Sequence, residues 1–595
     1  MADTIPARLV ELARTHPERP AYHVRTGGAW VATPFGDYAR LVRKAARALL
    51  ALGFEAKQTA CVLGFNRPEW AIFHVACMAA GGAPAGIYTT SSPSEVAYIV
   101  GHAEAPLLLL ESRAQWERLQ AALAPLKTLR RVVLMPGESA AGDARLLSWE
   151  DFLALAEAIP EARVEERSAA LEPGGLATLI YTSGTTGPPK GVMLSHANLS
   201  FVANVACELL SVNADDRMLS YLPLSHIAEQ AFTILGPVYG GYSIYFAESL
   251  ERVPDNLKEV QPTIFFGVPR IWEKFHSGIT ARLSGVSPLK QYVFNWASRV
   301  GRRACELRNR SESPTGLLAL EHALAKRLVY SQLKPAIGLG AARLCVSGAA
   351  PIPRQVLDFF AGLDIVVHEV YGQSEDTGPT SFNLPGHTRL GTVGLPVPGV
   401  EVKIANDGEI LVRGPNVFLG YYKDPAATAN ALRDGWLHSG DLGALDQEGY
   451  LRITGRKKEI IITAGGKNIA PVNIEEAIKK LPIVEEAVVI GDARPYLTAL
   501  ITLNAEAAQK LIAGQGGAAG DPLHQSPEAR AAIESWLGEV NKELARVETV
   551  KKFCVLPRSF TIEGGELTPS LKLKRRVIAE KYRVEIEGMY SGGAA

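Results

Sequence analysis

A run of hydroxyl side chains and glycines from Tyr181 to Gly191, YTSGTTGPPKG, contains the residue types that bind a polyphosphate. Glycines let the backbone approach a ligand closely, so amide N–H groups, hydroxyls and one ammonium can face one concavity. The residues that would supply these groups are Thr182, Ser183, Gly184, Thr185, Thr186, Gly187 and Lys190. A Walker loop is excluded, because Gly191 rather than Ser or Thr follows the lysine. A polar surface linker is the alternative interpretation.

Two later motifs each contain a carboxylate that suits nucleotide chemistry. In EVYGQSED, residues 369–376, Glu375 is a hard oxygen ligand of the kind Mg²⁺ prefers, with Tyr371 and Gly372 beside it for stacking and close approach. In DGWLHSGDLG, residues 434–443, Asp441 stands in a Gly-flanked turn and could accept both hydroxyls of a ribose. The simpler alternatives are a solvated acid for Glu375 and an Asx-turn for Asp441.

Three further clusters complete the set of candidate motifs. SGAAP, residues 347–351, would let a flat ring lie against the backbone, although an ordinary strand-to-helix turn has the same composition. TGRKKEIIITAGGKNIAP, residues 454–471, runs from a basic cluster through a strand into a Gly-Gly-Lys turn. TPSLKLKRR, residues 568–576, is a basic run near the C-terminus.

The elements around these motifs predict an α/β fold. From Phe35 to about Pro136, helices and strands alternate, which is typical of a mainly parallel sheet covered by helices. The expected helices are 39–52, 69–79, 92–102 and 113–123, and the expected strands are 59–64, 85–88, 107–110 and 131–135. A strand over residues 176–180 would deliver the phosphate loop to a sheet edge, and Pro188 and Pro189 disfavour a helix directly after it. Residues 137–173 read as a polar connection.

The second half of the chain predicts three more parts. A second α/β stretch runs from His196 to Gly267, and residues 344–371 return to strand, turn, helix and strand. Between them, residues 279–339 form a long helical, charge-rich insertion, which we interpret as a solvated amphipathic covering element. Residues 393–450 indicate a β-subdomain with a hairpin at the Asn-Asp-Gly turn, residues 406–408. Beyond Gly455, helices 475–481 and 528–543 with strands 484–490 and 498–503 suffice for a small α+β domain, and residues 514–521 form a surface loop.

Composition limits the functional class. The 595 residues are too many for one hydrophobic core, so two or more domains are expected. The 62 Lys and Arg balance the 62 Asp and Glu, so the chain has no net charge that would attract nucleic acid. The six cysteines are scattered without a C-x-x-C pair, which fits a reducing cytosol. We predict no signal peptide at the N-terminus. The apolar window 70–88 fits a buried helix and strand better than a membrane span. We expect a cytoplasmic protein whose membrane contact, at the inner face, would be peripheral; a homodimer is left open.

The ordered motifs YTSGTTGPPKG, GAAP, YGQSE, SGDLG, GRKKEIIITAGGK and TPSLK resemble the adenylate-forming superfamily of acyl-CoA synthetases. FFGVPRIWEKF, residues 265–275, and the helical insertion resemble its long-chain fatty acyl-CoA synthetases. The resemblance implies a large domain, residues 1–454, and a small mobile domain, residues 455–595, with the substrates between them. It also implies ATP, Mg²⁺ and coenzyme A: a fatty acid and ATP give acyl-AMP and pyrophosphate, and CoA then takes the acyl group.

Site residues carry over from this resemblance position by position. Thr186 and Glu375 match the Mg²⁺-linked positions, His226 matches the carboxylate and acyl entrance, and Lys572 matches the lysine that reaches the forming acyl-phosphate bond. The adenine and AMP platform would comprise Gly348, Ala349, Ala350, Glu369, Val370, Tyr371, Gly372 and Gln373, with Asp441 and Arg456 at the ribose and phosphate. Lys458 matches the hinge, Gly465, Gly466 and Lys467 match the segment that faces the site during thioester formation, and Phe266, Gly267 and Val268 are expected in the acyl pocket with His226.

One position departs from the pattern. Many relatives place a glycine before the counterpart of Lys572, whereas Leu571 stands here, and Lys574 is the nearest competitor for the role. His226 could instead be a hydrogen-bonded structural histidine. Two other functions stay open: an adenylate-forming enzyme with another acid or a carrier-protein acceptor, and a non-catalytic nucleotide- or acyl-binding protein.

Overall fold

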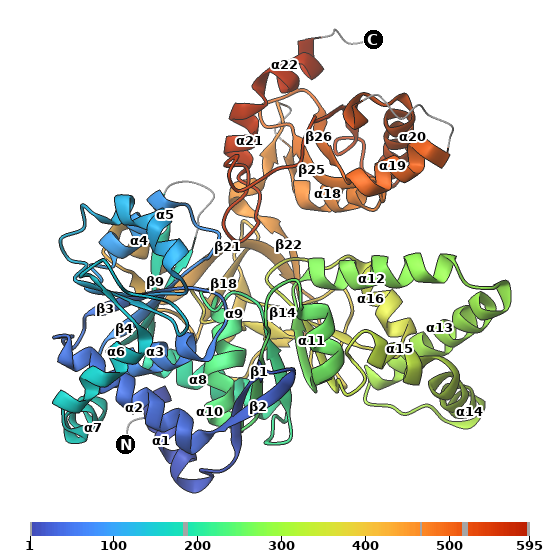
Figure 1. Ribbon diagram of the computed structural model, residues 1–595. Helices are drawn as coiled ribbons and strands as arrows, with labels where there is room; N and C mark the ends of the chain where they lie inside the picture. Colours follow the sequence, from blue (N-terminus) through green and yellow to red (C-terminus); the bar gives the residue numbers. More distant parts are fainter. Residues whose placement is uncertain (1–2, 183–187, 465–466, 515–521, 592–595) are drawn as a thin grey trace.

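A computed structural model describes residues 3–182, 188–464, 467–514 and 522–591 (Figure 1). The large part of the chain contains helix-covered sheets, and the small C-terminal part lies above the strands that join the two (Figure 1). The α/β class predicted from the sequence is therefore confirmed. Among the described residues, no helix combines the length and apolarity needed to cross a bilayer.

The largest sheet has eight strands in the order β19-β9-β8-β4-β3-β5-β6-β7. These strands are β3 (Thr59–Leu63), β4 (Ala83–Ile87), β5 (Leu107–Leu110), β6 (Arg131–Leu134), β7 (Leu146–Leu147), β8 (Leu176–Thr182), β9 (Lys190–Ser195) and β19 (Gly420–Tyr421). All neighbouring strands from β8 to β7 are parallel, as predicted. Strand β9 pairs antiparallel with β8, and β19 pairs antiparallel with β9. The strand predicted before the phosphate loop is present as β8, which lies inside the sheet. The chain after the prolines extends into β9, which covers that edge of β8.

Helices cover this sheet where the alternating pattern predicts them. They are α2 (Phe35–Ala51), α3 (Pro68–Ala79), α4 (Pro93–His102) and α5 (Arg113–Leu123). The predicted polar connection over 137–173 is wrong in one respect, because it contains α6 (Trp149–Ala154) and α7 (Glu161–Ala169). Trp149, Phe152 and Val164 anchor these helices, because their side chains are buried in the main core. The Ala/Glu-rich composition of the segment gave no clear helical pattern of apolar residues.

Two smaller sheets continue the large domain. One has the order β10-β11-β1-β2 and the other β12-β13-β14-β15-β16. Their strands are β1 (Pro20–Thr26), β2 (Ala29–Pro34), β10 (Arg217–Ser220), β11 (Ser243–Phe246), β12 (Ile264–Gly267), β13 (Leu344–Ser347), β14 (Val367–Tyr371), β15 (Ser381–Phe382) and β16 (Leu395–Pro396). The helical segments between them are α8 (His196–Leu209), α9 (Ile227–Gln230), the π-helix η2 (Ala231–Leu235), α10 (Gly236–Gly240), α11 (Val253–Val260) and α16 (Arg354–Gly362).

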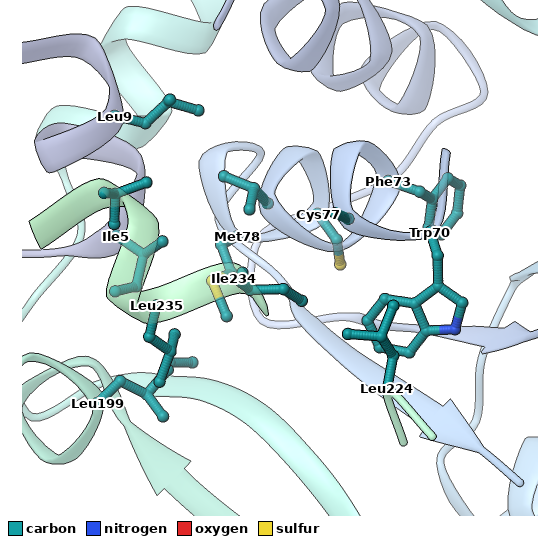
Figure 2. Close-up of a cluster of buried hydrophobic side chains, with 14 of the residues drawn as sticks. Ile5, Leu9, Trp70, Phe73, Cys77, Met78, Leu199, Leu224, Ile234 and Leu235 are labelled. Carbon is teal, nitrogen blue, oxygen red and sulfur yellow. The ribbon is translucent and has the colours of Figure 1, made fainter. Parts of the chain in front are cut away.

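The main core joins segments that lie far apart in the sequence. Figure 2 shows Ile5 and Leu9 of α1 (Ile5–Thr15) near Ile234 and Leu235 of η2, with the α3 side chains alongside. Helix α3 is buried on almost every side, since eleven of its residues are buried. This confirms a buried helix in the apolar window around Trp70. Because a helix buried to this extent is closely packed against its neighbours, it holds in place the strands that carry the site.

The predicted helical insertion forms a lobe at one side of the molecule (Figure 1). It contains α12 (Pro269–Ser284), α13 (Pro288–Arg308), α14 (Gly316–Ala325), the π-helix η3 (Lys326–Tyr330) and α15 (Ser331–Ala336). Asp364, two residues after α16, holds the lobe to the sheet through ion pairs with Arg308 and Lys334 (2.8 Å) and through a 2.9 Å contact with His322 Nε2. The sequence could not identify Asp364 as the shared partner of these three side chains.

The β-subdomain and the small domain follow. Strands β17 (Glu401–Ile404) and β18 (Glu409–Arg413) form the predicted hairpin, and β18 pairs with β21 (Trp436–Leu445), which pairs with β20 (Leu432–Arg433) and β22 (Leu451–Arg456). The small domain has β25 (Val484–Ile490), β26 (Leu497–Leu503) and β27 (Val550–Val555), with α18 (Pro471–Lys479), α19 (Ala505–Gly514), α20 (Pro527–Glu543), α21 (Arg575–Lys581) and α22 (Arg583–Ser591). The expected boundary at residues 454/455 falls inside β22.

Candidate functional site

A cavity of about 850 Å³ lies between the two domains and has a polar end and an apolar arm. The predicted residues that line its polar end are Thr182, Lys190, Ala349, Val370, Gly372, Gln373, Glu375, Asp441, Arg456, Lys458 and Lys572. They come from strand ends and turns of both domains. One volume therefore holds groups that are almost four hundred residues apart in the chain.

Asp441 has partners on both carboxylate oxygens. Its Oδ2 accepts from Tyr371 Oη (2.9 Å) and from Gln373 Nε2 (2.5 Å), and its Oδ1 pairs with Arg456 Nε at 3.0 Å. The residue lies in strand β21, opposite Arg456 in β22, so the predicted turn is wrong. A register shift between Leu442 and Gly443 accommodates the glycines within the strand pair.

Glu375 faces the cavity beside the end of the phosphate loop. Tyr421 Oη donates to Glu375 Oε1 at 2.8 Å, and Lys190 Nζ lies 4.8 Å from the centroid of the same tyrosine ring. A carboxylate in this position fits Mg²⁺. Within the described residues no group of three or more His, Cys, Asp or Glu side chains gathers for a metal, so phosphate oxygens would complete the coordination. Tyr421 could not be identified as a site residue from the sequence, because two adjacent tyrosines do not by themselves indicate a function.

Lys572 is presented by a tight turn that the sequence TPSLK explains. Leu571 N–H donates to Thr568 O (2.8 Å), Thr568 N–H donates to Lys572 O (2.8 Å), and Pro569 occupies the second turn position. Leu571 has φ +61°, the left-handed position that closes such a turn and that glycine usually fills. Removal from bulk water, and then the neighbouring Arg456, lower the pKa of Lys572. Lys572 is an exposed residue that lines the open cavity.

Replacing Leu571 with glycine should stabilise the small domain. The left-handed conformation costs a residue with a Cβ roughly 1–2 kcal/mol, and the greater freedom of unfolded glycine offsets about 0.5–1 kcal/mol. We expect a net gain of about 0.5 kcal/mol in the free energy of unfolding, measured by urea denaturation. Leu571→Ala keeps the Cβ and serves as the control. An equal gain in both variants would contradict the assignment of strain.

His226 lies at the junction of the polar end and the apolar arm. It precedes α9, and its Nδ1 accepts a hydrogen bond from Ala228 N–H (3.1 Å). Burial, and then the charge of Lys572, lower the pKa of His226 to about 4, so the ring is neutral near pH 7. With Nδ1 as acceptor, the ring proton resides on Nε2. The structural role of this histidine as a helix cap is thus compatible with its place in the cavity wall.

The apolar arm follows the C-terminal half of α8. Its α8 side is formed by Val202, Ala203, Val205, Ala206, Cys207, Leu209 and Leu210. The other apolar lining residues of the arm are Ile227, Ala228, Ala231, Phe232, Gly236, Tyr242, Ile264 and Phe266. Of the predicted acyl-pocket residues, His226 and Phe266 line the cavity. Gly267 and Val268 are not among its lining residues: Gly267 O accepts from Trp272 Nε1 (3.0 Å), and Val268 precedes α12.

Other predicted residues lie near the cavity without lining it. Glu369 Oε2 accepts from Gly391 N–H (3.0 Å), and burial raises the pKa of Glu369 to about 7. Tyr371 is buried and directed at Asp441; the residue after it, Gly372, does line the cavity and packs so closely on the Gly378 carbonyl that no Cβ would fit. Gly348 and Ala350 flank the lining residue Ala349. Lys467 is exposed on the small domain, whereas Ser183–Gly187, Gly465 and Gly466 lie outside the described residues.

Contacts between the two domains hold Lys572 in the cavity. Arg270 of α12 forms an ion pair with Glu486 of β25, and Lys479 of α18 lies 3.5 Å from the same carboxylate. On the other side, Thr90 Oγ1 donates to Pro569 O at 2.8 Å, next to the Lys572 turn. The structure thus has the small domain closed with its lysine directed at the polar end.

Comparisons with known proteins agree with this geometry. Residues 9–422 match the AMP-binding enzyme family, and residues 458–594 match the AMP-binding enzyme C-terminal domain. The chain is 36% identical to long-chain-fatty-acid–CoA ligase ACSBG2 of Homo sapiens over 99% of this chain and 92% of that protein. It is 36% identical to long-chain-fatty-acid–CoA ligase FadD15 of Mycobacterium bovis, over 99% and 97%. The adenylation domain of a carboxylate reductase from Mycobacterium chelonae shares the fold, with a TM-score of 0.74, 22% identity, and coverage of 99% and 91%.

Proposed function

Since the chain belongs to the AMP-binding enzyme family, we propose that it is an AMP-forming ligase that joins a long-chain fatty acid to coenzyme A. A carboxylate oxygen of the acid attacks the α-phosphorus of ATP, giving acyl-AMP and pyrophosphate. The thiol of coenzyme A then loses its proton and attacks the acyl carbon, giving the thioester and AMP. The observation that carries the proposal is the single cavity in which the polar groups meet an apolar arm.

Each polar group has a task in the first step. The ammonium groups of Lys572 and Lys190 offset the negative charge of the phosphates, which otherwise repel the attacking carboxylate. His226 Nε2–H donates a hydrogen bond to the acid at the junction with the apolar arm. Asp441 accepts the ribose hydroxyls in place of its present donors. Glu375 and Thr186 would hold Mg²⁺, which supplies further positive charge at the phosphates when bound.

The apolar arm selects a long acyl chain. Burial of each methylene contributes about 0.8 kcal/mol, so affinity grows with every carbon that the α8 wall covers. The experiment that tests the proposed function measures pyrophosphate release across acids of graded length, with free coenzyme A or a carrier protein as acceptor. We expect the fastest pyrophosphate release with long acids. The nucleotide product should be AMP, and free coenzyme A should accept the acyl group. Formation of ADP, or thioester formation only with a carrier protein, would overturn it.

We also propose that the domains divide at residues 454/455 and that the small domain, residues 455–595, turns about Lys458 between the two steps. Coenzyme A needs the space that Lys572 occupies, and Gly465–Lys467 would replace it. A cytoplasmic location is supported by the six cysteines, all of which are free. Peripheral contact with the inner membrane face and a homodimer stay predictions.

Replacing Arg270 with alanine should slow the first step more than the second. The lost pair with Glu486 belongs to the closed pose, and a half-exposed ion pair contributes up to about 1 kcal/mol, or about fivefold in the population of that pose. Acyl-AMP formation is measured in single turnover, against thioester formation from supplied acyl-AMP. Arg282→Ala, on an exposed part of the same helix, is the control. Equal slowing of both steps would contradict the role of the pair.

A further inference from the structure

The helix α14 and its continuation η3 expose a row of leucines. Leu317, Leu320, Leu324 and Leu328 are 73%, 70%, 49% and 47% exposed. Their spacing of three and four residues places them on one face of the helix. The opposite face packs on α13, where Ala325 and Tyr330 are buried with Ala297 and Val300. The sequence interpretation of this insertion as a solvated covering element is therefore wrong for this face, which is apolar and uncovered.

The lobe that carries this leucine face is strongly basic. From Arg282 to Lys334 the sequence has ten Lys and Arg against three Glu and no Asp, whereas the whole chain is balanced. Lys326 and Arg327 are exposed and lie between Leu324 and Leu328 in the sequence. A helix with leucines on one face and cations beside them has the composition that binds the interface of an anionic bilayer.

The position of the helix favours a flat surface over a groove. In Figure 1, α13 and α14 lie at the outer edge of the lobe, away from the small domain. At the start of α13, Leu289 and Tyr292 are also 73% and 67% exposed. Tyrosine is enriched at the headgroup level of membranes because its ring is apolar and its hydroxyl polar.

We propose that the leucine face of α14 and η3 docks on an anionic lipid bilayer, with the helix lying in the plane of the headgroups. The leucines enter the boundary between headgroups and acyl chains, while the basic residues of the lobe attract the anionic lipid phosphates. Docking holds the enzyme at the surface into which a long-chain acid partitions. Only this last consequence depends on the proposed function; the docking itself rests on the exposed face and its charge.

Vesicle sedimentation of the full chain, without ATP, acid or coenzyme A, tests the proposal. The probes are vesicles of phosphatidylcholine mixed with phosphatidylglycerol, and vesicles of phosphatidylcholine alone. The wild type should bind the anionic vesicles more tightly, and less so as salt is raised. The double variant L320E/L324E should bind at least about tenfold more weakly, because two apolar contacts become repelled charges. Leu250→Glu, at a 60% exposed leucine outside the lobe, should bind like the wild type.

Two further measurements make the outcome decisive. Thermal unfolding of L320E/L324E should match that of the wild type, since both side chains are exposed, and K326Q/R327Q should reduce the salt-dependent part of binding. Wild-type protein that binds neither vesicle, or a leucine variant that binds as well as the wild type, would overturn the proposal. So would a wild-type dimer that L320E/L324E converts to a monomer, because a second copy would then cover the leucines. Pyrophosphate release measured separately distinguishes these results from failure of the proposed function.

Discussion

The Lys572→Ala variant should form acyl-AMP about 10²–10³-fold more slowly than the wild type, which is the loss expected when one preorganised donor to a developing charge is removed. Lys572 lines the polar end of the cavity with Lys190, Glu375 and Asp441. Its ammonium is held there by the turn from Thr568, and no neighbouring side chain of the same turn carries a charge. Thioester formation from supplied acyl-AMP should be largely retained, because in the proposed rotation the small domain withdraws the lysine before that step.

Single-turnover pyrophosphate release measures the first step, and thioester formation from added acyl-AMP measures the second. Lys574→Ala is the matched control, because Lys574 precedes α21, its backbone N–H is bonded to Glu566 O at 2.8 Å, and it is not among the residues that line the cavity. The two lysines would exchange roles if Lys574→Ala alone abolished the first step. Equal loss of both steps in Lys572→Ala would instead contradict a lysine that serves only adenylation.

The Ala206→Trp variant should change the preferred acid from long to short. Ala206 lies midway along the part of α8 that lines the apolar arm, so an indole there occupies the path of the acyl chain. Each excluded methylene loses about 0.8 kcal/mol, or about fourfold in kcat/KM. A long acid that loses contact for about six methylenes loses three to four powers of ten, whereas an acid too short to reach Ala206 loses little.

The measurement is kcat/KM across a series of saturated acids. Glu208→Trp places the same side chain on the exposed face of the same helix and should leave the chain-length profile unchanged. A uniform loss for all acids in Ala206→Trp would indicate damage to the fold. An unchanged profile would show that the acyl chain takes another path.

The parts of the site that could be predicted from the sequence are those in which chemistry restricts the residue type. Asp441, Arg456, Glu375 and Lys572 stand in short motifs of glycine and charged residues, and the fold brings all four to one cavity. The conformation around them was harder to predict. Gly440 and Gly443 suggest a turn at Asp441, whereas pairing with β22 keeps the segment extended and a register shift absorbs the irregularity.

The apolar arm could not be predicted because a cavity wall and a packed core use the same residues. Val202, Ala203 and Leu209 recur at helical spacing, as core residues do, and the sequence does not reveal which of them face empty space. The leucine face of α14 was missed for the opposite reason. The Lys and Arg residues of the insertion suggested a solvated surface, and only the packing of α13 against Ala325 and Tyr330 determines which leucines remain uncovered.

The contacts of Thr90 with Pro569 and of Arg270 with Glu486 close the small domain over the cavity from two sides. An acyl-phosphate anhydride is easily hydrolysed, and its lifetime depends on how freely bulk water and product exchange with the pocket. The closed small domain therefore also limits exchange between the pocket and bulk solvent. Under the proposed rotation, it would keep the activated acid in the pocket until the thiol enters, so the movement that changes the chemistry would also set when the intermediate is exposed.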